Sequence, residues 1–283
     1  MKGFLTCAGI AAAASVLAAS AAMAAGAEPN IAGIWWTTTY SPKILVAGGG
    51  DPPLNAAGKT QYQQNQAGLK DGSLIDKARK VCIPDGVPRV LETPYPFEIF
   101  QVPVGQITMI HELNHQLRVI ALGKPLGKYE DLAPFENYNG YSVGHYEGDT
   151  LVIDTVGIKT GPYTMVDQFG TPHTQALHVI ENYRLIDYEA ANQALERGAK
   201  ENASFVNNDS GVVADLNAKG KHLQLEFTVE DAGAFTTPWS ATVIYRPGVN
   251  VASSSEFPEA VCAENPHELA RQAAVPIADK SDF

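Results

Sequence analysis

The sequence predicts an all-β chain whose strands form an antiparallel meander closed into a barrel. From about residue 95 to residue 246, short runs rich in β-branched and aromatic residues follow one another with turn-forming residues between them. Helical segments do not alternate with these runs, which argues against a parallel α/β sheet. An open meander of this length would expose two edges, and closure into a barrel removes them.

The first part of the chain contributes one strand and a less regular region. Residues 33–40 are rich in aromatic and β-branched side chains and predict the first strand. Residues 47–58 contain four glycines and two prolines and predict a loop. The polar segment 59–80 is compatible with a short surface helix, and residues 82–89 form an extended segment interrupted by proline and glycine.

Closely spaced strands make up the rest of the barrel. Tight turns are expected at Val104-Gly105, Asn114-His115 and Glu147-Gly148-Asp149, because Gly, Asn and Asp tolerate a positive φ. Residues 188–203 have a helical composition, and the tail after Pro247 is expected to be irregular. A barrel of eight to ten strands can hold one small ligand, as in lipocalins, so the predicted fold is a lipocalin-like β-barrel with a small helical insertion. The expected strands are 96–102, 106–112, 116–122, 141–146, 150–156, 176–186, 222–229 and 240–246.

The N-terminal segment has the features of a cleavable secretory signal peptide. Lys2 is followed by an Ala-rich apolar run, and small residues offer cleavage sites after Ala24 or Ala27. We therefore predict a signal peptide over residues 1–27, a single domain over residues 28–283, and a periplasmic or secreted protein. The apolar run is too short and too Ala-rich for a good membrane span, so no membrane insertion is expected.

Charge and cysteine content narrow the function classes. The net charge is −11 and no cluster of Lys and Arg is present, so a nucleic-acid partner is not expected. Export makes cytosolic cofactors such as NAD or ATP improbable, and we predict no cofactor. Without Cys7, which lies in the signal peptide, Cys82 and Cys262 remain and are expected to form a disulfide. A reactive thiol is the alternative.

Four sequence blocks resemble those of a large family of exported bacterial proteins, most of which have no assigned function. The central block, residues 141–157, is similar to the family hallmark G-[HY]-S-V-G-[RH]-[WY]-E-G-D-T-L-V-V-D-T, and the other blocks lie at 88–118, 173–181 and 235–239. The family is similar to lipocalin-like barrels, so the resemblance implies the fold and the compartment rather than a reaction. Residues 188–212 are an insertion relative to the family, which could cover one barrel mouth.

The first group of candidate catalytic residues lies around the turn at residues 114–115. His111 and Glu112 face opposite sides of an extended strand, so they are not expected to point inward together. Because Glu112, His115 and Arg118 also recur in the resemblance, we favour these three; a His oriented by a carboxylate is a common general base. The alternative is a solvated hairpin corner with an Arg–Glu ion pair.

A second group lies on the strands at 141–146 and 150–156. Tyr141, His145 and Glu147 share one strand face, which is either the barrel interior or the polar outer face. At His145 many family members carry Arg, so a role that needs a permanent cation there is in doubt. Asp154 lies in an apolar strand and is expected to have a His, Arg or Tyr partner. A hydrogen bond to a backbone turn is its alternative.

Two further histidines could complete a site. His173 follows a proline in a loop, and His178 begins a strand. Three His with a carboxylate could bind zinc, but no compact motif such as H-E-x-x-H is present, and we predict no metal site. The sequence also lacks a G-x-S-x-G motif, which disfavours a serine hydrolase.

These features lead to two functional hypotheses. The favoured one is a cofactor-free lyase, dehydratase or isomerase acting on a hydrophobic aromatic or terpenoid molecule, with His115 as base, Tyr141 or His145 as acid, Asp154 orienting and Arg118 stabilising an oxyanion. The alternative is a periplasmic carrier of lipocalin type. In both, a hydrophobic small molecule is the partner, and the aromatic side chains expected to line its pocket are Trp35, Tyr95, Phe97 and Trp239.

Overall fold

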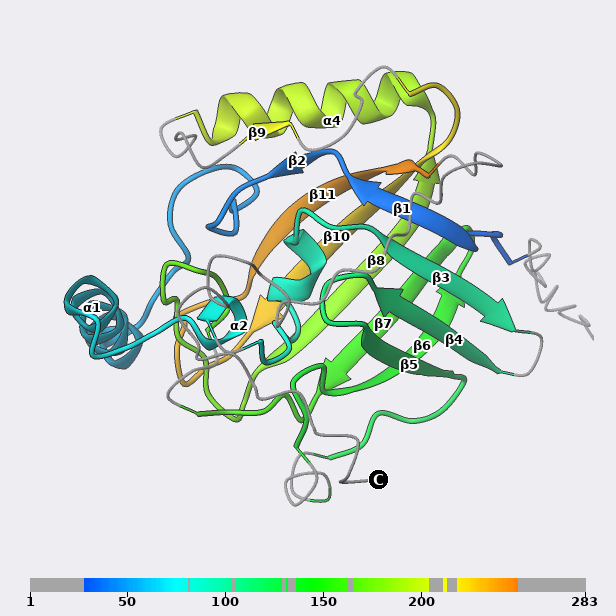
Figure 1. Cartoon of the computed structure of the whole chain (residues 1–283). Helices are drawn as coiled ribbons and strands as arrows, with labels where there is room; N and C mark the ends of the chain where they lie inside the picture. The colour runs from blue at the N-terminus through cyan, green and yellow to red at the C-terminus, as the bar shows by residue number, and fades with distance from the viewer. Residues whose placement is uncertain are drawn as a thin grey trace, which may run out of the picture.

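Nine strands form a closed barrel, with one long helix along its outer wall and a second helix at one end (Figure 1). This is a computed structural model, and it describes residues 28–80, 82–102, 105–128, 131, 136–161, 165–203, 211–212 and 218–248. The predicted all-β barrel with a small helical insertion is therefore confirmed.

The elements follow the predicted order closely. The strand expected over residues 33–40 is divided at Thr38 into β1 and β2, and the helix expected within 59–80 begins earlier, at Ala56. The bounds are β1 Gly33–Thr37, β2 Thr39–Tyr40, α1 Ala56–Asp71, α2 Lys77–Lys80, the 3₁₀ helix η1 Arg89–Glu92, β3 Phe97–Val102, β4 Gln106–His111, β5 Gln116–Leu122, β6 Tyr141–Glu147, β7 Thr150–Val156, β8 His178–Ile186, α4 Tyr188–Glu201, β9 Gly211–Val212, β10 His222–Glu230 and β11 Trp239–Pro247.

The barrel strands are arranged around the ring in sequence order, and β1 closes the ring between β3 and β11. One pair departs from the predicted antiparallel pattern: β5 and β6 are parallel, and they pair only over Ile120–Leu122 and Ser142–Gly144. The connection over residues 123–140 is long, as a parallel pairing requires, because the chain must return to the end where β5 began. Outside these three residue pairs, β5 and β6 are not hydrogen-bonded to each other, and we call this weakly paired part of the barrel wall the seam.

Alternation along the strands places one set of side chains inside the barrel. The fully or almost fully buried side chains include Val179, Tyr183, Leu225 and Phe227. Arg184, the next residue after Tyr183 on β8, points the other way and is exposed. These interior side chains belong to one continuous hydrophobic core. The interior of a small barrel is filled in this way by its own side chains, so the centre offers less room for a ligand than the lipocalin comparison implies.

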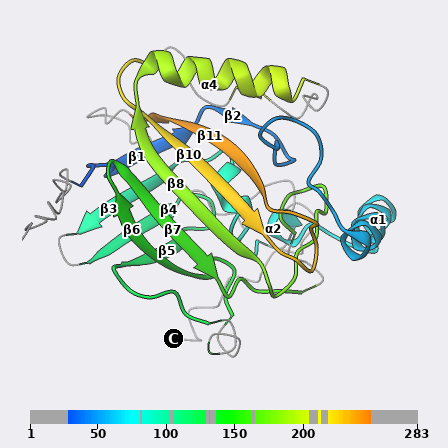
Figure 2. The same cartoon turned by 180° about the vertical axis from the view of Figure 1, so that it is seen from behind.

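Helix α4 lies along the outer wall of the barrel, as both views show (Figures 1 and 2). Ala191, Ala194 and Leu195 pack against Ile186 and Ile244, which point outward from β8 and β11. The helical part of the predicted insertion, α4, therefore covers a side of the barrel and not a mouth, because its apolar face matches apolar side chains on the outer surface. None of the described helices is long and apolar enough to cross a membrane.

Two sequence predictions fall wholly or partly outside the described residues. The signal peptide over residues 1–27 and the tail that contains Cys262 belong to the part of the chain that is not described. Cys82 is described and is half-buried. Export and the Cys82–Cys262 disulfide therefore remain predictions.

Candidate functional site

A buried ion pair connects two opposite parts of the barrel interior. Arg118 on β5 donates two hydrogen bonds to Glu181 on β8, at 3.0 Å from Nη1 to Oε2 and 2.6 Å from Nη2 to Oε1. Arg118 is 2% exposed and Glu181 is 0% exposed. Tyr183 Oη donates to Glu181 Oε2 at 2.9 Å and Thr155 Oγ1 donates to Oε1 at 3.4 Å, so three residues donate to the carboxylate.

The pair fixes the charge state of Arg118. Burial would lower the pKa of Arg118, but the charge and hydrogen bonds of Glu181 outweigh this and raise it above its usual value. Arg118 Nε is buried and has no hydrogen-bond partner in the described part of the chain. Arg118 therefore stays protonated, its charge is balanced by that of Glu181, and its Nε–H remains as a donor without a partner in the described part of the chain.

His111 and Glu112 are both buried, contrary to the expectation that only one of them would point inward. His111 ends β4 and stacks on Phe97 with ring centroids 5.2 Å apart, while Glu112 already lies in the turn, where strand alternation no longer applies. Burial, together with the charge of Arg118, lowers the pKa of His111 to about 3. Burial raises the pKa of Glu112 to about 7.

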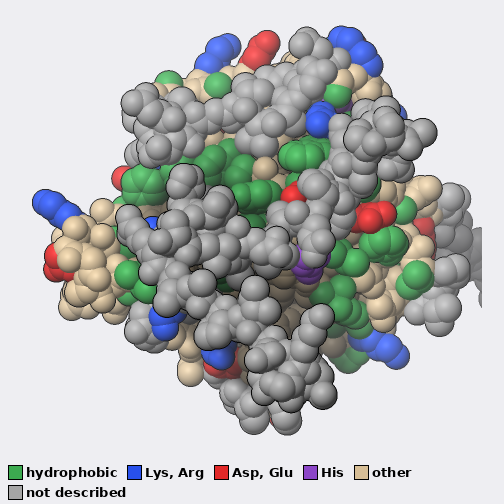
Figure 3. All heavy atoms as spheres, in the orientation of Figure 1, with side chains coloured by type: hydrophobic (Ala, Val, Ile, Leu, Met, Phe, Trp, Pro, Cys, Tyr) green, Lys and Arg blue, Asp and Glu red, His purple; other side chains and the backbone are tan. Residues whose placement is uncertain are grey.

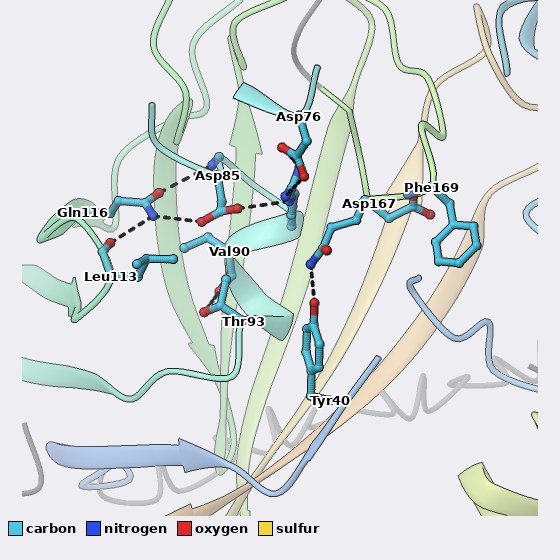
Figure 4. Close-up of polar contacts among 12 residues, drawn as sticks. Tyr40, Asp76, Asp85, Val90, Thr93, Leu113, Gln116, Asp167 and Phe169 are labelled. Atoms are coloured by element: carbon cyan, nitrogen blue, oxygen red, sulfur yellow. Dashed lines mark hydrogen bonds and ion pairs between the residues drawn. The ribbon is translucent and has the colours of Figure 1, made fainter. Parts of the chain in front are cut away.

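A polar network closes one end of the barrel (Figure 4). Arg89 donates to Asp76 at 2.7 and 3.0 Å and pairs with Asp85 through Nε at 3.0 Å. Gln116 Nε2 donates to Asp85 at 3.3 Å and to Leu113 O at 3.2 Å. The network thus ties the turn that precedes β5 to the segment around residue 85.

The pocket beside this network has a volume of about 20 Å³ and includes Tyr95 and Glu92 in its lining. This is room for about one water molecule and not for an organic ligand. Tyr95, one of the predicted ligand-contacting aromatic residues, therefore lies at a closed barrel end.

A cavity of about 700 Å³ follows the seam between β5 and β6. Its lining includes His115 and Tyr141, and it extends to Arg118 and Ser142, whose side chains belong to the barrel interior. The groove opens here because β5 and β6 pair over only three residues on each strand. Three of the predicted catalytic residues, His115, Arg118 and Tyr141, thus line a single groove.

The turn that carries His115 has an unusual backbone. Asn114 and His115 both have positive φ, 59° and 47°, and His115 N donates to Glu112 O at 3.1 Å, so the predicted tight turn is confirmed. Left-handed backbone is uncommon for residues other than glycine and often accompanies functional sites. The conformation leaves the His115 side chain exposed at the groove.

The other predicted catalytic residues of this region lie on the outer surface, away from the groove. His145 is 3.0 Å from Glu147, and both side chains are exposed. His178 lies between Asp154, at 3.0 Å, and Glu230, at 3.1 Å. Asp154 therefore has a partner of one of the predicted types, His178, and does not orient His115.

His173 and three of the predicted aromatic residues make contacts that hold the fold together and do not line the groove. His173 Nδ1 lies 3.2 Å from Thr174 O, and burial lowers the pKa of His173. Trp35 Nε1 donates to Ile31 O at 2.9 Å. Phe97 and Trp239 are core residues, 3% and 5% exposed. These three rings were expected around a ligand, whereas they belong to the hydrophobic core of the barrel.

Sequence reasoning did not assign roles to Glu181, Arg89 or Gln116. Glu181 could have been found by the argument applied to Asp154, since it lies between the apolar residues Val179 and Tyr183 on one strand face. Asp85 lies only four residues before Arg89, but the contacts of Arg89 with Asp76 and of Gln116 with Asp85 join separate segments and have no local sequence signal. In the described part of the chain, no group of three or more His, Cys, Asp or Glu side chains could hold a metal ion.

No protein-family model matches the chain, and neither a curated protein nor a solved structure matches it. Membership of the exported family that the sequence resembles therefore stays a prediction.

Proposed function

We propose that this protein is a cofactor-free lyase, dehydratase or isomerase whose active site is the groove between β5 and β6. One observation carries the proposal: His115 and Tyr141 line the same 700 Å³ groove as the buried cation Arg118. A base, an acid and a guanidinium N–H donor around one cavity are groups that proton-transfer catalysis can use.

The roles follow from the chemistry of each group. His115 takes a proton from carbon or a hydroxyl group of the substrate, and Tyr141 gives a proton to the leaving oxygen, which departs as water in an elimination. Solvent then returns a proton to Tyr141 and removes one from His115. Arg118 Nε, the unpaired buried donor, stabilises negative charge on a substrate oxygen that reaches past β5 into the barrel interior.

The apolar side chains that line the groove favour a hydrophobic substrate. Leu117 and Val119 on β5 are 55% and 47% exposed, and both line the groove, as do Tyr138 and Val143. Large exposed apolar side chains on a strand mark a binding surface when they gather in one place. Hydrophobic side chains over β3 to β5 are visible in the space-filling view (Figure 3). An aromatic or terpenoid alcohol combines an apolar body with a group that can leave.

We also propose that the chain is exported and that the reaction takes place in the periplasm or outside the cell. A site that works there without a dissolved cofactor must rely on side chains and water, and the groups in the groove meet that requirement. The mass of the protein recovered from the periplasm tests export, since it would correspond to cleavage after Ala24 or Ala27.

The activity is tested with a panel of hydroxylated aromatic and terpenoid compounds. Protein purified from the periplasm and dialysed against EDTA is incubated with each compound, and products are identified by liquid chromatography and mass spectrometry. We expect loss of water or an isomer from at least one compound, and no product with the double variant His115→Ala/Tyr141→Phe. Compounds recovered unchanged after long incubation, although bound, would instead favour a carrier.

A further inference from the structure

A second cavity, of about 280 Å³, lies beneath α4, away from the groove between β5 and β6. It is bounded by the C-terminal half of the helix, by the segment around residues 39–47 and by β11, and it shares no lining residue with the groove between β5 and β6. An apolar cavity of about 150 Å³ is enough to bind benzene, so this space is sufficient for a larger compact molecule.

Most of the wall is apolar. Leu45, Ala47, Leu195 and Ile244 contribute to it, and Ile244 and Leu195 also belong to the small hydrophobic cluster that holds α4 against the barrel. Such a lining favours a ligand with an apolar body, since each buried CH₂ group contributes about 0.8 kcal/mol to transfer from water.

A buried hydrogen-bond acceptor without a partner belongs to one of the residues that line the cavity. Asn202, 2% exposed, follows the last residue of α4, and its Nδ2 donates to Gly198 O at 3.2 Å and to Val46 O at 3.4 Å. These contacts orient the amide and leave Asn202 Oδ1 buried with no hydrogen bond in the described part of the chain. Buried acceptors are usually satisfied, so an unpaired one at a cavity indicates a missing donor.

Glu92 gives the same cavity a further polar group, beside Asn202 and the charged residues Arg197 and Glu201 on α4. It lines both this cavity and the small pocket at the barrel end, and its carboxyl makes no hydrogen bond within the described residues. Burial, with a smaller contribution from Asp167, raises the pKa of Glu92 well above its usual value. A neutral carboxyl can both donate to and accept from a hydroxyl group, and it imposes no requirement for a charged ligand.

We propose that the cavity beneath α4 binds a compact apolar molecule with one hydroxyl group, an alcohol or a phenol, whose O–H donates to Asn202 Oδ1. This site is distinct from the proposed active site, and it would hold such a molecule whether or not the groove is catalytic.

Gly198 provides a way to fill the cavity without crowding the backbone. It lines the cavity from α4, and a Cβ atom built on it meets no heavy atom within 4 Å. Leucine at this position would place its side chain in the cavity and would also favour the helix, because glycine is a poor helix former. Gln193→Leu, on the exposed side of the same helix and away from the cavity, is the matched control.

Binding is measured by calorimetric titration with two probes of equal size, 4-propylphenol and 4-propyltoluene. The wild type and Gln193→Leu are expected to bind the phenol about tenfold more tightly than the toluene, the value of one hydrogen bond to an otherwise unpaired buried acceptor. Asn202→Ala is expected to remove this preference, and Gly198→Leu to abolish binding of both probes. Equal affinities for the two probes in the wild type, no binding of either, or unchanged binding by Gly198→Leu would each overturn the proposal.

Discussion

Replacing Arg118 by methionine is expected to remove a large part of the stability of the barrel. The substitution keeps a long apolar side chain in the interior but leaves Glu181, which is 0% exposed, without its cation. Removing one partner of a buried ion pair costs about 3–5 kcal/mol, because the remaining charge is buried and uncompensated. Glu181 would keep the hydrogen bond from Tyr183, so we expect about 3 kcal/mol.

The double variant Arg118→Met/Glu181→Leu separates the charge from the packing. It removes both buried charges and takes the carboxylate acceptor from Tyr183 and Thr155; Thr155 keeps Ser142 as a partner at 2.9 Å, so the cost is about 1 kcal/mol for Tyr183. The double variant should therefore be more stable than Arg118→Met alone. Lys221→Met, which breaks the exposed pair with Asp187 at 2.6 Å, is the control and should change the free energy of unfolding by less than about 1 kcal/mol.

Equilibrium urea unfolding, followed by circular dichroism, measures these differences. With a slope of about 3 kcal/mol per molar urea for a domain of this size, the midpoint of Arg118→Met should fall by about 1 M. The reasoning would be refuted if Arg118→Met unfolded at the wild-type midpoint. It would also be refuted if the loss in the double variant equalled the sum of the losses in Arg118→Met and in Glu181→Leu, measured alone.

Three further predictions concern titration, backbone strain and the cysteines. Since burial raises the pKa of Glu112 to about 7, the native state binds more protons than the unfolded state between about pH 4.5 and 7, and the free energy of unfolding falls as pH rises through this window. Glu112→Gln should thus be about as stable as the wild type at pH 4 and more stable at pH 8 in urea unfolding; the same difference at both pH values would contradict the assignment. His115→Gly relieves a left-handed backbone and should raise the thermal midpoint by about 3 °C, a gain that an unchanged midpoint would disprove. A non-reducing digest of exported protein should yield a peptide that links Cys82 to Cys262, and alkylation of both thiols without reduction would exclude the disulfide.

The sequence predicted the strands well because their signals are local. Alternating or continuous β-branched and aromatic runs, separated by residues such as Gly148 with φ of 62°, define β6 and β7 almost to the residue. The parallel pairing of β5 and β6 was not predicted. Nothing in either strand specifies its direction relative to the other, which depends on the path of residues 123–140.

The candidate site was predicted only in part, for a related reason. Strand alternation shows which residues share a face, and it correctly grouped Tyr141 with His145, but it does not say which face is inside. His145 is exposed beside Glu147, whereas Tyr141 reaches the groove because it lies at the end of β6 where the pairing with β5 has not yet begun. The position of the seam, a property of the closed barrel, determines which of these residues share a cavity.

The central claim is that catalysis takes place in the groove lined by His115 and Tyr141. The most direct test is kcat/KM for one compound that the wild type converts, measured in His115→Ala and in His145→Ala, which changes an exposed histidine outside the groove. Loss of a general base should lower kcat/KM of His115→Ala by about 10²–10⁴-fold, with His145→Ala within about twofold of the wild type. Equal effects of the two substitutions, or an unchanged kcat/KM in His115→Ala, would contradict the account.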